Sequence, residues 1–102
     1  KKNYKAYFNL ANLNRLSDSS AAKKYIDIAL SIQETKEAKL IKSYLLINEY
    51  NYIEAIKFLD EIKSSESYYL LGISHLALGT VAKNGNRKVY ISNYDLGKSI
   101  AV

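Results

Sequence analysis

The residues of this chain that could carry out acid–base chemistry are few and far apart. The only histidine, His75, lies in an apolar stretch, and the chain has no cysteine. A catalytic histidine needs a nucleophile or a second acid held beside it. Ser74 is adjacent in the chain and would point elsewhere on a helix. Asp27 and Asp60 occupy equivalent places in two similar segments, which indicates helix-face or turn roles. We therefore expect a packed His75 and a chain that is not an enzyme.

The composition argues against a metal or cofactor site as well. Without cysteine there is no thiolate zinc site, and one histidine excludes a multi-histidine site within the chain. No phosphate-binding loop is present. No apolar run approaches the ~20 residues needed to cross a bilayer, so we expect no membrane span in this segment. The sequence does not decide whether the protein is cytoplasmic or is exported from a bacterium.

The positive charge of the chain is unevenly distributed. The formal net charge is +5, divided into +4 in residues 1–30, −2 in residues 31–66 and +3 in residues 67–102. A middle segment of opposite sign argues against a continuous track for nucleic acid. We interpret most lysines as solvated helix-face residues. Weak binding of nucleic acid, driven by the net charge, remains a minor alternative.

The spacing of apolar residues and the absence of proline predict helices throughout. Residues 49–51 read as a tight turn between two of them. The predicted helices cover about residues 3–16, 20–32, 34–48, 52–63 and from 66 onward. Ser31 and Glu34 have the spacing of a capping box, which places the break between the second and third helices near residues 31–35. Asn51 and Glu54 repeat this spacing, and Ser64 can cap the helix that follows.

Two interpretations fit the chain beyond Gly79. The fifth helix could continue to Lys83 and end at Asn84-Gly85, a good left-handed cap. Alternatively, Val81–Ile91 could form a hairpin around the same dipeptide, although an isolated hairpin is marginally stable. We favour the helix, and expect a last helix from about Tyr94 to Ala101.

An internal repeat connects the second and fourth predicted helices. The segment AKKYIDIA at residues 22–29 aligns with AIKFLDEI at residues 55–62, an offset of 33 residues. Alanine, lysine, an aromatic residue, a branched aliphatic residue and aspartate recur in order. A period in this range with two helices per unit is typical of a helical solenoid.

Three segments resemble the tetratricopeptide-repeat (TPR) family. AYFNLA at residues 6–11 is similar to the opening of that family's first helix, and YYLLG at residues 68–72 places Leu71-Gly72 at the family's Leu-Gly positions. YNYIEAI at residues 50–56 is similar to its turn and second-helix start. The resemblance implies an all-α domain, a right-handed stack of about three antiparallel helix hairpins. The single domain would span residues 1–102 of a longer protein, with units at about 3–32, 34–63 and 65–101 and an insertion near 80–91 interrupting the last unit.

Such a stack needs small residues where its helices cross. Ala11, Ser43, Gly72 and Ala55 occupy these positions. A bulky side chain there should overpack the crossing by ~1–3 kcal/mol.

The first helices of the stacked units would line a concave groove suited to an extended peptide or a helix. Helical spacing predicts the groove-facing residues Lys5, Phe8, Asn12, Arg15, Glu37, Leu40, Tyr44, Ile47, Asn48, Glu66, Tyr69, Ile73 and Leu76. A second interpretation places Phe8, Leu40 and Ile73 in the core or against a neighbouring domain. Lys83, Arg87 and Lys88 in the insertion form a secondary candidate contact for an acidic partner.

Some TPR proteins clamp a terminal carboxylate with lysine and asparagine side chains from successive units. Asn12 and Asn48 are available here, but Ile73 and Leu76 stand where cations would be required. We therefore do not expect that role. The sequence predicts a module without cofactor that binds another protein, as a peptide, a helix or a domain. The alternative is a structural module that only packs within a larger chain.

Overall fold

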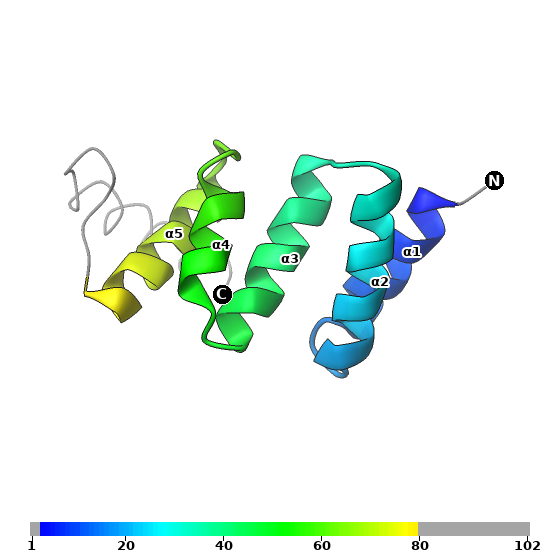
Figure 1. Cartoon of the computed structure of the whole chain (residues 1–102), viewed down its shortest axis with the longest axis horizontal. Coiled ribbons are helices and arrows are strands. Elements are labelled where there is room, and N and C mark those ends of the chain that lie inside the picture. Colours follow the sequence, from blue (N-terminus) through cyan, green and yellow to red (C-terminus); the bar gives the residue numbers. More distant parts are fainter. Residues whose placement is uncertain (1–2, 80–102) are drawn as a thin grey trace.

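The described part of the computed structural model, residues 3–79, is entirely α-helical (Figure 1). It contains five helices and no strand: α1 Tyr4–Asn14, α2 Ser19–Ile32, α3 Lys36–Asn48, α4 Tyr52–Leu59 and α5 Ser65–Leu78. The predicted all-α fold class is confirmed. The predicted insertion near 80–91, the helix at 94–101 and the residues Lys83, Arg87 and Lys88 lie outside the described residues.

Short polar side chains begin four of the helices. The backbone N–H of Ala6 donates to Asn3 at 3.1 Å, and that of Ala21 donates to Asp18 at 3.1 Å. Thr35 caps α3 in the same way. At α5, Ser64 and Ser67 form a reciprocal capping box. Each cap satisfies a backbone donor that the first helical turn leaves open.

Several predicted helix limits need correction. Ser31 caps nothing, because it lies inside α2 and its hydroxyl donates to the Ile28 carbonyl at 2.6 Å. Asn51 is the N-cap of α4 but makes no side-chain capping bond. Helix α4 ends at Leu59, four residues early, in two turns that place Ile62 in the core at 2% exposure. Helix α5 ends at Leu78, because Gly79 adopts a left-handed φ of 68°.

The helices pack in an open row. Each contacts the next along the chain, and α3 also contacts both α1 and α5, whereas α1 touches neither α4 nor α5. Figure 1 shows α2 and α4 in front of α1 and α5, with α3 between the two pairs. The Tyr4 hydroxyl meets the Thr35 hydroxyl at the starts of α1 and α3, and Arg15 after α1 lies over the ring of Tyr44 in the C-terminal half of α3. These two helices therefore run in the same direction. Lys23 at the start of α2 pairs with Glu49 after the end of α3 at 3.1 Å, so these two are antiparallel.

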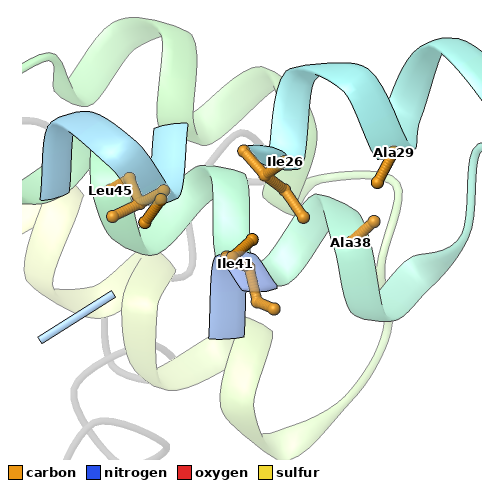
Figure 2. Close-up of a cluster of buried hydrophobic side chains, with 7 residues drawn as sticks. Ile26, Ala29, Ala38, Ile41 and Leu45 are labelled. Atoms are coloured by element: carbon orange, nitrogen blue, oxygen red, sulfur yellow. The ribbon is translucent and has the colours of Figure 1, made fainter. Parts of the chain in front are cut away.

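Small residues allow the close approach of the helices, as expected. Ala11, Ser43 and Ala55 are fully buried, and Gly72 is buried as well. Between α2 and α3, Ala29 faces Ala38, with larger aliphatic side chains beside them (Figure 2). Most of the buried hydrophobic residues form two clusters: Ala11, Ala22, Ile26, Ala29, Ala38, Ile41 and Leu45 in the first, and Leu46, Ala55, Leu59, Leu70 and Leu71 in the second.

Candidate protein-binding groove

A hollow of about 350 Å³ lies between α1, α3 and α5, and we name it the α1–α3–α5 groove. It is lined by Phe8, Asn12, Arg15, Glu37, Leu40, Ile41, Tyr44, Glu66 and Leu70. Seven of these nine residues were predicted to face a groove from helical spacing alone; Ile41 and Leu70 were not. The structure thus brings together side chains from α1, α3 and α5.

Helical periodicity explains which side chains reach the groove. Phe8, Asn12 and Arg15 follow one another at steps of four and three residues, so they share one side of α1 and its C-terminal end. Leu40 and Tyr44, four residues apart, share one side of α3 in the same way. Phe8 and Tyr44 pack their inner parts against the first core cluster, and Leu40 packs against the second. The floor of the groove is therefore the outer surface of the core.

Arg15 connects α1 to α3 across the groove. Its Nε donates to Asn12 Oδ1 at 2.9 Å, and its guanidinium carbon lies 5.5 Å from the centre of the Tyr44 ring. A guanidinium over an aromatic face is a favourable cation–π arrangement. These two contacts hold the cation in place before any partner arrives. Among residues 3–79, Arg15 forms no ion pair.

The two glutamates of the groove also form no ion pair within residues 3–79. Glu37 and Glu66 lie in the first turns of α3 and α5 and are exposed. Neither forms an ion pair within the described chain; Glu66 only accepts a long 3.4 Å hydrogen bond from the Ser65 hydroxyl. The other four glutamates of residues 3–79 all form ion pairs: Glu34 and Glu61 with Lys39, Glu49 with Lys23, and Glu54 with Lys57.

The remaining predicted groove residues lie outside this lining. Ile47, Tyr69 and Ile73 are half-buried and pack against the second core cluster. The second interpretation of the sequence placed Phe8, Leu40 and Ile73 in the core or against a neighbouring domain, and all three are half-buried and pack against a core cluster. The other three, Lys5, Asn48 and Leu76, are exposed.

A second hollow, of about 440 Å³, was not predicted from the sequence. It is lined by Asp27, Leu30, Ser31, Glu34, Lys39, Glu54, Lys57, Phe58 and Glu61. Both of its lysines form ion pairs with its glutamates: Lys39 Nζ lies 2.7 Å from Glu61 and 3.8 Å from Glu34, and Lys57 Nζ lies 3.3 Å from Glu54. The hydrogen bond with Glu61, more than any other interaction, raises the pKa of Lys39. Because Lys39 and Glu61 are 22 residues apart, no local sequence signal marks this pairing.

His75 is buried, at 9% exposure, as the sequence predicted. Desolvation lowers the pKa of its imidazole, and the charge of Asp60 opposes that effect. The histidine does not line either hollow.

The described chain offers neither a metal site nor a membrane-spanning helix. Residues 3–79 contain no group of three or more histidine, cysteine, aspartate or glutamate side chains that could hold a metal ion. None of the five described helices is both long and apolar enough to cross a membrane. Comparisons with protein-family models, curated proteins and solved structures found no match to this chain.

Proposed function

We propose that this chain is a non-catalytic protein-interaction module that binds a segment of another protein in the α1–α3–α5 groove. One observation carries the proposal: α1, α3 and α5 place around a single hollow aromatic and aliphatic side chains together with charged ones that form no ion pair within the described part of the chain. Covering the apolar parts of Phe8, Leu40 and Tyr44 would stabilise a complex by roughly 25 cal/mol for each Å² removed from water. The charges would set the orientation of the bound segment.

We further infer that the chain is a TPR-like helical repeat. Positions 33 residues apart are buried alike: Ala22 and Ala55 are both fully buried, and so are Ile26 and Leu59. The sequential packing of α1 to α5, with α3 against both α1 and α5, supports the same inference. In repeat proteins of this kind, extended concave surfaces commonly bind other proteins.

The experiment is a selection from a displayed library of random 12-residue peptides, with the purified chain as the target. Affinities of the enriched peptides are then measured by fluorescence anisotropy. In the blocking variant, Asn12→Phe, a large ring enters the groove at an exposed lining position. Its matched control, Asn9→Phe, places the same ring at an exposed position of α1 outside the lining.

We expect the enriched peptides to lose roughly tenfold or more in affinity for Asn12→Phe, about 1.4 kcal/mol, and to bind Asn9→Phe like the unmodified chain. Circular dichroism melting confirms that both variants fold. If no peptide is enriched, or if both variants bind equally well, the groove is not the binding site.

Exposed apolar side chains near two turns favour a second candidate, a structural module that packs within a larger assembly. Leu13 and Leu16 are 76% and 74% exposed near the turn between α1 and α2, and Ile53 is 62% exposed after the turn between α3 and α4. Contiguous exposed apolar surface often marks a contact with another protein. Self-association that disappears in Leu13→Gln/Leu16→Gln, measured by sedimentation equilibrium, would support this candidate; an unmodified chain that is monomeric at all concentrations would count against it.

A further inference from the structure

The charges of the α1–α3–α5 groove are separated along its length. Glu37 lies two turns before Tyr44 on α3, a distance of roughly 10 Å along the helix axis. Arg15 lies against Tyr44, with its guanidinium carbon 5.5 Å from the ring centre. Because α1 and α3 run in the same direction, Glu37 and Arg15 lie toward opposite ends of the groove.

The acidic end is formed by two helices. Figure 1 shows that α3 and α5 begin at the same side of the row, so their first turns lie toward the same end of the groove. Glu37 and Glu66 occupy these first turns, and both line the hollow. The apolar floor between the two ends comes from Phe8, Leu40 and Leu70. The groove therefore reads, from one end to the other, as acidic, apolar and basic.

All three charges are left without an ion partner in residues 3–79, whereas the lysines and glutamates around the second hollow are paired. A partner could supply ion pairs for all three: a cation between Glu37 and Glu66, and a carboxylate against the guanidinium of Arg15. The guanidinium is suited to a carboxylate because its planar N–H groups can donate two parallel hydrogen bonds.

Building on the proposed function, we propose that the groove selects a partner segment in which lysine or arginine, apolar residues and then a carboxylate occur in that order along its length. The basic end would lie between Glu37 and Glu66, and the carboxylate would lie on Arg15. This occupant follows from charge complementarity with the groove.

The test uses the same selection of displayed 12-residue peptides. The peptides whose binding is blocked by Asn12→Phe are then sequenced. We expect them to share a basic residue, apolar residues and an acidic residue in a fixed order. The double variant Glu37→Lys/Glu66→Lys should lower their affinity roughly tenfold or more, and more strongly at low salt.

Two controls separate recognition from stability. Glu54→Lys raises the net charge by the same amount as Glu37→Lys or Glu66→Lys alone. The Glu54 carboxylate lies outside the groove, on α4, where it pairs with Lys57. We expect affinity within about twofold of the unmodified chain for this variant, because a charge outside the contact acts weakly. Peptides with the basic residues replaced by glutamate should regain binding on Glu37→Lys/Glu66→Lys, which loss of folding could not produce.

The outcomes distinguish this inference from the function on which it rests. Peptides that bind in the groove without the expected charge order, or that tolerate the double variant unchanged, would overturn the inference and leave the groove as a binding site. If no enriched peptide is blocked by Asn12→Phe, both fail.

Discussion

Tyr50 adopts a backbone conformation that non-glycine residues rarely take. Its φ is 63°, in the left-handed region, and it is the only non-glycine residue with positive φ in the described chain. Tyr50 N–H donates to the Ile47 carbonyl and Asn51 N–H to the Leu46 carbonyl, which together close α3 with a Schellman motif. Glycine usually occupies this position because it has no Cβ.

Tyr50→Gly should therefore stabilise the chain. The left-handed conformation costs a non-glycine residue roughly 1–2 kcal/mol, and the extra freedom of glycine in the unfolded chain offsets roughly 0.5–1 kcal/mol of that gain. The ring is 80% exposed and only meets Tyr52 edge-on, so little packing is lost. We expect a net increase of about 0.5–1 kcal/mol in the free energy of unfolding, measured in urea. Tyr50→Ala removes the ring but keeps the strain; if it stabilises as much as glycine, the strain account is wrong.

His75 should make stability depend on pH. Burial lowers the pKa of its imidazole below the ordinary value of 6.5. The unfolded chain therefore takes up a proton as the pH falls through 6.5, while the folded chain resists protonation until a lower pH. Stability from this group is complete above pH 6.5 and is lost as the pH falls toward the folded pKa. Urea unfolding at pH 7.5 and 5.5 should show the loss, and His75→Gln should reduce it; an identical loss in the variant would contradict this assignment.

At the scale of the helices, the close crossing of α3 and α4 depends on small residues. Ala55 is fully buried, and so is Ser43 on the neighbouring helix. Ala55→Leu should lower the free energy of unfolding by ~1–3 kcal/mol, because three extra carbon atoms have no space. The matched control, Ala6→Leu, adds the same side chain at an exposed position of α1 and should change stability by less than about 0.5 kcal/mol. Equal effects of the two substitutions would show that the crossing is not tightly packed.

The helices and one face of the groove could be predicted because both depend on local periodicity. Phe8, Asn12 and Arg15 share one side of α1 by spacing alone, and the structure places all three in the same hollow. The break between α2 and α3 falls within the predicted residues 31–35, but Thr35 rather than Ser31 caps α3, because α2 continues past Ser31 to Ile32.

Contacts between distant residues could not be predicted in the same way. The Arg15–Tyr44 contact and the Lys39–Glu61 pair join residues that are 29 and 22 positions apart. They depend on how α1, α3 and the chain after α4 pack, and periodicity within one helix does not contain this information. The same reason explains why the second hollow was missed.

At the scale of the whole molecule, the open row of helices leaves two hollows accessible, the α1–α3–α5 groove and the second hollow. A closed bundle would bring α1 against α4 or α5 and cover the groove, but α1 contacts neither of them. The charges of the second hollow are paired, whereas those of the α1–α3–α5 groove form no ion pair among residues 3–79, so the two sides are chemically different. On this basis, the two sides should differ in their capacity to bind a partner.

The most direct test is to map a selected peptide onto the ¹⁵N-labelled chain by NMR. We predict that titration shifts the amide signals of Asn12, Arg15, Tyr44 and Glu66, which all lie around the groove. The signals of Lys57 and Glu61, at the second hollow, should stay in place. Shifts concentrated at Lys57 and Glu61, with the four groove signals unchanged, would contradict the account.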